Sequence, residues 1–467
     1  MAAAQKSDLL KKFGLVLGPL LLLTVYFSSV PGLSAAGRGA LAIALFTAAW
    51  WVFMVVPPVL PALFACILFM VSGVAKPVDA FAGFSNPSIW MIVFALVISK
   101  SVDASGLGKR VAINIITAGK LTFGRVVAAM IFLCTVAPFF IPSGAAYVAL
   151  LMALAVSVID AVGLPKDKRS QLGAAITCFV AVLSLMMGRI PLTGAVANII
   201  SIGLVKELAN TDITWLEWFA NMWPVGPVVL AATYLYCTKV YQPEVNFADP
   251  QVKAKLIAKR DALGAMTAKE IRAAGFVSLA LVLWVTGAWH GISTNAVGAI
   301  VTALLLLPVI GVVGMEDFQK LPWHIFIFAG GSFSIGVVLT KTGVAEWIGN
   351  AVSGLEIIST GGFAVKAGFI VLIAFVVHIL LETMGEISLL VPIFLKSGLV
   401  SAKAVAMLVP YAAGLYLFPY QATPIILSLG FGICNWNDIL KYSFFICAVA
   451  IIQALVFLTS YWAYTMA

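Results

Sequence analysis

The chain has 467 residues, of which 62% are hydrophobic and only 10% are charged. This number of charges is too small to cover the surface of a soluble domain of this length. The composition therefore excludes a soluble protein and indicates an integral membrane protein. The apolar runs have the length of membrane helices, which favours an all-α bundle over a β-barrel. The net charge of +9 comes largely from Lys and Arg in short loops, where they set topology, and does not indicate nucleic-acid binding.

The apolar runs predict a first membrane helix within an N-terminal segment, 1–37. A first repeat, 38–240, should follow, with crossings at 38–56, 59–75 and 88–104, a hairpin at 126–161, a broken helix at 171–206 and a helix at 216–239. The polar segment 241–271 is predicted to be an amphipathic cytoplasmic linker whose basic side chains favour anionic lipid headgroups. A second repeat, 272–467, should contain crossings at 272–289, 294–313 and 323–341, a hairpin at 364–397, a broken helix at 403–431 and a last helix at 440–464.

Without the hairpins, these spans give about eleven transmembrane helices. If the N-terminus is cytoplasmic, four basic groups fall on the cytoplasmic side, as the positive-inside rule requires. These groups are the Lys residues before the first helix, Lys109-Arg110, the stretch 166–169 and the linker. The C-terminus should then lie outside. The two re-entrant hairpins should enter from opposite sides, so that the repeats are inverted.

One series of features occurs twice. Phe84-Ser85-Asn86-Pro87-Ser88-Ile89-Trp90 opens an apolar span that ends in Ser105-Gly106-Leu107, and Leu321-Pro322-Trp323 opens one that ends in Thr342-Gly343-Val344. Each copy is followed by an apolar hairpin with a polar tip and then by a span interrupted by Gly and Pro. Duplicated halves with paired broken helices are typical of secondary transporters that bind substrate near the membrane midplane.

These residues resemble the divalent anion–sodium symporter family. The resemblance rests on the 84–90 motif with Gly106-Leu107-Gly108-Lys109-Arg110, on Asp317 to Trp323 with Thr342-Gly343, and on Thr267-Ala268-Lys269-Glu270 leading to Trp284 and Trp289. It implies two inverted repeats, a homodimer and an elevator mechanism, in which one part slides through the membrane against a fixed scaffold. It also implies small anionic substrates, mostly di- and tricarboxylates and sulfate, usually moved together with Na⁺.

The sequence departs from the family pattern at the expected site. The family carries Ser-Asn-Thr at each hairpin tip, whereas this chain has Pro142-Ser143-Gly144-Ala145-Ala146 and Glu382-Thr383-Met384-Gly385-Glu386. In the first broken helix, Gly194-Ala195-Val196-Ala197-Asn198 replaces Gly-Thr-Pro-Pro-Asn. In the second, Ala422-Thr423-Pro424 remains, but Ile426 replaces the Asn.

Substrate binding is predicted at the tips and breaks, because helix N-termini there present free N–H groups to an anion. The predicted substrate-binding residues are Ser143, Gly144, Ala145, Arg189, Asn198, Glu382, Thr383, Met384, Gly385, Gln421 and Thr423. The alternative is that the small residues at the tips serve only close helix packing.

Ion coupling is predicted at the same positions. Backbone carbonyls and side-chain oxygens of the broken helices would hold Na⁺; the candidates for ion coupling are Ser143, Thr193, Gly194, Asn198, Glu382, Glu386, Ala422 and Thr423. Alternatively, Arg189 supplies the positive charge and Glu382 or Glu386 carries a proton, which would give proton-coupled symport or anion exchange. A third possibility is a structural ion pair between Arg189 and one of these glutamates. His378 is predicted to pack or cap a helix rather than relay protons.

The chain has no Gly-Lys-Ser/Thr phosphate loop and no His/Cys/carboxylate cluster with the spacing of a metal enzyme. It is therefore not expected to be an enzyme or to hold a cofactor. The sequence predicts a secondary active transporter for a small organic anion in a bacterial inner membrane, coupled to Na⁺ or H⁺.

Overall fold

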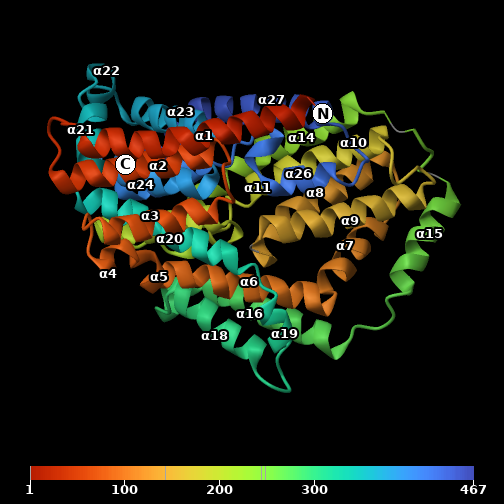
Figure 1. The fold of residues 1–467 in the computed structure, drawn as a ribbon. Coiled ribbons are helices and arrows are strands. Elements are labelled where there is room, and N and C mark those ends of the chain that lie inside the picture. The colour runs from red at the N-terminus through yellow and green to blue at the C-terminus, as the bar shows by residue number, and fades with distance from the viewer. Residues whose placement is uncertain (1, 142, 243, 248, 467) are drawn as a thin grey trace.

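The computed structural model describes residues 2–141, 143–242, 244–247 and 249–466, so Pro142 of the predicted first tip lies outside the described residues. Within these ranges the regular elements are all helices, which form a bundle with many axes in one general direction (Figure 1). Eight of them are long and apolar enough to cross a membrane, and five shorter apolar helices accompany them. The all-α membrane fold is thus confirmed, whereas the number of crossings stays a prediction.

The first half begins with α1 (Ala2–Phe27), α2 (Ala35–Val52) and α3 (Val59–Val71), followed by the short α4 (Pro77–Ala80) and α5 (Ala82–Ser85). It continues with α6 (Pro87–Ser105), α7 (Leu107–Thr117), α8 (Phe123–Phe140) and α9 (Gly144–Ala161). The broken helix then consists of α10 (Gln171–Cys178), a π-helical turn η1 (Phe179–Leu183), α11 (Ser184–Met187), a 3₁₀ turn η2 (Leu192–Gly194) and α12 (Val196–Ala209). Next come α13 (Trp215–Met222), α14 (Val225–Val240) and the connecting α15 (Pro250–Asp261).

The second half starts with α16 (Ala268–Val285), α17 (Gly287–His290), α18 (Thr294–Leu306) and α19 (Met315–Gln319). It continues with α20 (Trp323–Lys341), α21 (Val344–Ser353), α22 (Glu356–Ser359), α23 (Phe363–Leu380) and α24 (Thr383–Ser397). The second broken helix consists of α25 (Ala402–Ala412), a 3₁₀ turn η3 (Pro419–Gln421) and α26 (Thr423–Leu429). The chain ends with α27 (Trp436–Gln453), a π-helical turn η4 (Ala454–Leu458) and α28 (Thr459–Met466).

The sequence repeat has a counterpart in the backbone. Helices α6 and α20 are both 19 residues long, and each is separated from the next helix by a turn with one glycine in the left-handed region. These are Gly106, with φ of 81°, and Gly343, with φ of 82°. Glycine adopts this conformation without steric cost, which explains why both copies have it at this turn.

Both predicted breaks are present. In the first, α11 ends at Met187 and α12 begins only at Val196; in the second, α25 ends at Ala412 and α26 begins at Thr423. In each break a 3₁₀ turn precedes an extended alanine, Ala195 or Ala422, which directly precedes the next helix. The helix pairs α8–α9 and α23–α24 form the two hairpins, and they lie on opposite halves of the view in Figure 1.

Two predicted helices differ in extent. The span 216–239 is two helices, α13 and α14, because Pro224 interrupts the chain between them and lacks the N–H that a continuous helix would need. Helix α16 begins at Ala268, before the predicted 272, because Thr267 and Glu270 form a reciprocal capping box there.

The segment that joins the halves is tied to both. At the outer edge of the bundle (Figure 1), α15 contacts α7 and α9, and Lys259 Nζ lies 2.8 Å from Asp160 Oδ2 at the end of α9. Arg110 Nε donates to Glu270 Oε1 over 2.7 Å, and its other nitrogens donate to the carbonyls of Leu263, Gly264 and Ala265. The hydrogen bond from Arg110 lowers the pKa of Glu270 to about 2.

Candidate functional site

Arg189 joins the two broken helices. Its Nη2 donates to the carbonyl of Ala413 over 2.8 Å and to the hydroxyl of Tyr416 over 3.0 Å, both in the second break. The side chain is only 3% exposed. Gly414 makes room for it, since a Cβ there would lie 2.9 Å from Arg189 Cγ.

The guanidinium of Arg189 is not fully paired. Within the described residues, its Nε and Nη1 are buried and have no hydrogen-bond partner. A buried charge with unused donors is costly, which is why such a group is a candidate for binding an anion. The ion pair considered from the sequence does not form: among the described residues, no salt bridge joins Arg189 to Glu382 or Glu386.

Glu386 instead pairs with His378 across the second hairpin. Glu386 Oε2 lies 2.8 Å from His378 Nδ1, and both side chains are fully buried. The imidazole meets the ring of Tyr416 edge-on, with centroids 5.1 Å apart. Glu386 Oε1 and His378 Nε2 have no partner within the described residues. Four buried polar atoms of Arg189, His378 and Glu386 are thus unpaired around Tyr416.

The sequence reasoning missed this pair, because it favoured packing or capping over a proton relay for His378 and did not link His378 to Glu386. A usable signal was present: His378 and Glu386 stand four residues on either side of Glu382, at the hairpin tip. Antiparallel helices bring such positions face to face.

Glu382 and its neighbours form the N-terminus of α24. Glu382 Oε2 accepts from the Met384 N–H over 2.8 Å, so this carboxylate caps the helix. Thr383 is buried and Met384 is partly buried. A Cβ on Gly385 would lie 2.6 Å from the Trp51 ring, so close packing accounts for the glycine.

The first tip is more open. Ser143 Oγ accepts from the Ala146 N–H over 3.4 Å and caps α9, while Ala145 is exposed. A Cβ on Gly144 would lie 2.8 Å from Leu185 Cδ2 and 3.5 Å from the Tyr147 hydroxyl. The tip therefore packs against the first broken helix, and no hydrogen bond joins its described residues to Arg189.

Asn198 closes the first break. Its Nδ2 donates to the carbonyls of Gly188 and Pro191 over 3.2 and 3.1 Å, and its Oδ1 is buried without a partner among the described residues. Thr193 is fully buried and its hydroxyl accepts from the Trp215 indole over 3.3 Å. Gly194 packs against Gly188, whose carbonyl would lie 2.6 Å from a Cβ at this position.

The first break is also fixed by α13. The indole of Trp218 donates to the Arg189 carbonyl over 3.0 Å, and Glu217 Oε1 lies 2.6 Å from Lys403 Nζ on α25.

Gln421 holds the backbone of the second break, as Asn198 holds that of the first. Its Oε1 accepts from the N–H groups of Leu417 and Phe418, and its Nε2 donates to the His378 carbonyl over 2.9 Å. Ala422 is partly buried, whereas Thr423 is exposed. The structure thus connects Arg189, Glu386 and Gln421 through shared neighbours.

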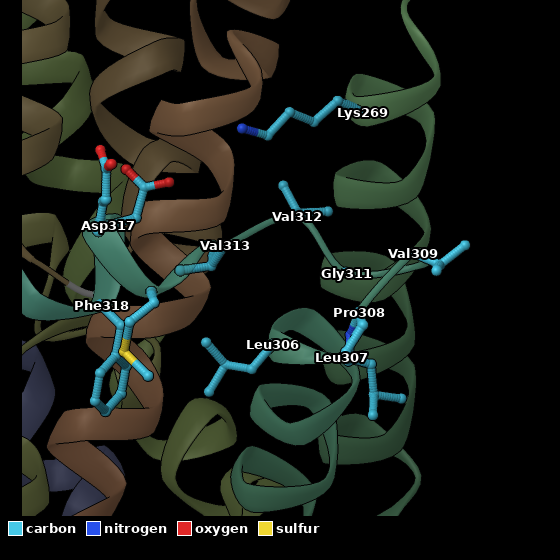
Figure 2. Close-up of a pocket in the computed structure, with 13 residues that line it drawn as sticks. Lys269, Leu306, Leu307, Pro308, Val309, Gly311, Val312, Val313, Asp317 and Phe318 are labelled. Atoms are coloured by element: carbon cyan, nitrogen blue, oxygen red, sulfur yellow. The ribbon is translucent and has the colours of Figure 1, made fainter.

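A surface pocket lies elsewhere, between α16, α18 and α19 (Figure 2). It is lined by Lys269, the segment from Leu306 to Val309, the segment from Gly311 to Asp317, and Phe318. It contains none of the predicted site residues. The cluster between the two breaks remains the candidate functional site, because the unpaired buried atoms of three ionisable side chains, Arg189, His378 and Glu386, meet there.

Comparison with known proteins gives the family. The sequence profile described as "Sodium:sulfate symporter transmembrane region" matches residues 11–467. A "Membrane protein" of Cupriavidus necator is 26% identical over 397 residues, which cover 82% of this chain and 76% of the relative. The "Citrate/succinate antiporter" of Escherichia coli K12 is 26% identical over 373 residues and the "L-tartrate/succinate antiporter" of the same strain 26% over 368; each covers 76% of this chain and 74% of the relative.

Solved structures share the fold. The Alcanivorax borkumensis YdaH transporter aligns with a TM-score of 0.57 at 13% identity, covering 86% of this chain and 89% of its own. Neisseria gonorrhoeae MtrF, described among antimetabolite efflux pumps, aligns at 0.54 and 12% identity, covering 88% and 97%. The resemblance inferred from the sequence motifs is confirmed, and the protein belongs to the sodium:sulfate symporter family, a family of membrane transporters and not of enzymes.

Proposed function

We propose that this protein is a secondary transporter that exchanges small dicarboxylate anions across a bacterial inner membrane. The observation that carries the proposal is Arg189, a buried cation at the junction of the two breaks with two donors left unpaired among the described residues. Both donors can make charge-assisted hydrogen bonds to carboxylate oxygens. Because Nε and Nη1 point to different sides of the guanidinium, they would bind separate oxygens, while Nη2 keeps its bonds to Ala413 and Tyr416.

Exchange accounts for the charge at this site. A permanently positive Arg189 supplies part of the neutralisation that Na⁺ would otherwise give to the anion. In an antiporter, the site returns across the membrane with a second anion and needs no coupling ion. Relatives at 26% identity are named citrate/succinate and L-tartrate/succinate antiporters, and the substrates in those names are di- and tricarboxylates.

The proposed mechanism is an elevator with two inverted repeats in a homodimer, with the N-terminus cytoplasmic and the C-terminus outside. Its support is the repeated order of helix, glycine turn, hairpin and broken helix, and the placement of the hairpins on opposite halves of the bundle (Figure 1). The capped N-termini of α9 and α24 at the tips would complete the anion site.

Counterflow into liposomes tests the proposal. Purified protein in liposomes loaded with unlabelled succinate should accumulate labelled succinate equally well in NaCl and in choline chloride. Empty liposomes should accumulate little. Arg189→Gln should abolish uptake, whereas Arg125→Gln, at the start of α8, should retain it. Equal uptake into empty and loaded liposomes would refute exchange.

Na⁺-coupled symport is the second candidate, and one atom favours it. Asn198 Oδ1 is a buried oxygen without a partner among the described residues, beside the carbonyls of the first break, and such oxygens bind Na⁺ in transporters of this design. Under this candidate, an inward Na⁺ gradient would drive uptake into empty liposomes, and Asn198→Ala would abolish that uptake.

A further inference from the structure

The His378–Glu386 pair lies within reach of the charge on Arg189 but is not part of the anion contact proposed above. His378 interacts electrostatically with Arg189 and with Glu382, and Glu386 interacts with Arg189. The Tyr416 side chain lies between them, with its ring against the imidazole and its hydroxyl on Arg189. A change of charge on the pair therefore acts directly on the guanidinium.

The pair can exist in two states that differ by one proton. In the protonated state one hydrogen is on Nε2 of His378 and another lies between Nδ1 and Glu386 Oε2, so the pair is neutral. In the deprotonated state Nδ1 donates its hydrogen to an ionised Glu386, Nε2 becomes an acceptor, and the pair has a charge of −1. Both states keep the 2.8 Å contact, so the proton can leave without breaking it.

These two states have different effects on an anion at Arg189. In the deprotonated state the negative pair offsets the guanidinium, so Arg189 and the pair together have no net charge. In the protonated state Arg189 and the pair together have a charge of +1, and His378 Nε2, which has no partner among the described residues, becomes one more donor. Proton binding and anion binding must therefore favour each other, since each is stronger when the other is present.

Other titratable groups around the pair are few or engaged elsewhere. Glu382 faces it from the tip, where it accepts from the Met384 N–H. The elements packed against α23 bring further such groups, but these have bonds to other partners: Lys403 to Glu217, Tyr411 to the Ala450 carbonyl, Tyr420 to the Ile379 carbonyl, and Tyr461 to the Ala220 carbonyl.

We propose that the His378–Glu386 pair is a proton-binding site that takes up one proton when a carboxylate binds at Arg189. The inference rests on the proposed anion site. It makes the affinity for a fully ionised anion depend on pH, and it makes His378 and Glu386 positioning and charge-setting residues for that anion. Exchange of anions of unequal charge is then accompanied by proton movement.

Calorimetry of succinate binding to the purified wild-type protein tests this between about pH 7 and 9, where both substrate carboxyl groups stay ionised. Titrations in buffers of different ionisation enthalpy give the number of protons taken up per succinate bound. We expect the uptake of up to one proton per succinate bound. Above the pH at which the free pair loses its proton, the affinity for succinate should weaken by up to about tenfold per pH unit. Glu386→Gln cannot reach the −1 state, so it should bind without proton uptake and with a flat pH profile.

The outcomes separate this inference from the proposed function. Succinate binding by the wild type with no proton uptake at any pH would overturn the inference and leave the anion site intact. Proton uptake that persists in Glu386→Gln would place the proton elsewhere and also overturn it. No succinate binding at any pH would instead refute the proposed function. Glu346→Gln, an exposed carboxylate on α21, is the matched control and should behave as the wild type.

Discussion

Replacing Arg189 by Gln should remove most of the affinity for a dicarboxylate. The substitution deletes the two unpaired donors, Nε and Nη1, together with the buried positive charge. Hydrogen bonds to charged groups contribute about 1.5–3 kcal/mol each. Two such bonds correspond to about 3–6 kcal/mol, or affinity weakened about 100-fold to 10,000-fold at 1.4 kcal/mol per tenfold.

The effect on stability should be much smaller. The shorter glutamine side chain would leave the buried Ala413 carbonyl without its donor, at a cost of about 1–3 kcal/mol. Removing an incompletely paired buried charge offsets this cost, because its desolvation penalty is removed as well. A large loss of binding at a similar melting temperature is therefore the signature of an anion-binding arginine.

The assay is calorimetric titration of succinate into detergent-purified protein, with the melting temperature of each variant measured in parallel. Arg189→Lys should bind succinate more tightly than Arg189→Gln but more weakly than the wild type, because lysine keeps the positive charge but lacks the two donors Nε and Nη1. Arg125→Gln is the control. A dissociation constant for Arg189→Gln within about threefold of the wild type, a difference of less than about 0.7 kcal/mol, would show that the guanidinium does not hold the substrate.

Two further predictions concern stability. Gly83→Ala should destabilise the protein by about 1–3 kcal/mol, because a Cβ there would lie 2.1 Å from the Gly330 carbonyl oxygen of α20. The control is Gly275→Ala, which should be neutral or stabilising because a Cβ there would have nothing within 4 Å. Equal melting temperatures for the two variants would contradict this prediction. Glu270→Gln should lower the melting temperature at pH 7. Since the folded pKa of Glu270, about 2, is below its unfolded value near 4.3, the stabilisation is complete above the unfolded pKa and is lost as pH falls towards 2. The gap between wild type and variant should therefore narrow below about pH 4, and a constant gap would exclude this role of the Arg110 pair.

Sequence patterns predicted the features that depend on local backbone requirements. The repeated motif around Gly106 and Gly343 marked the ends of two apolar spans, and the structure places a left-handed turn at each of these glycines, since glycine adopts that conformation easily. The two breaks were visible because Gly and Pro interrupt apolar runs. The ion pair between Lys100 and Asp103 is equally local, since the two residues stand three apart on α6, with 3.0 Å between Nζ and Oδ2.

The partners of the buried charges could not be predicted in this way. Arg189 bonds to Ala413 and Tyr416, which are 224 and 227 residues away, and no local pattern specifies which residues the tertiary packing brings there. The roles of the tips were likewise underdetermined. Glu382 could equally be a ligand or a helix cap, and only the 2.8 Å contact with the Met384 N–H shows the cap.

The contacts of α13 tie the two broken helices together. Trp215 and Trp218 hold this helix to Thr193 and Arg189 within the first break, and Glu217 ties it to the second broken helix through Lys403. Any displacement of one broken helix therefore pulls α13 and the other with it, unless these bonds exchange. Leu216 is 42% exposed on the same helix. A spin or fluorescent label at Leu216 would report the position of the proposed substrate site from a residue outside that site.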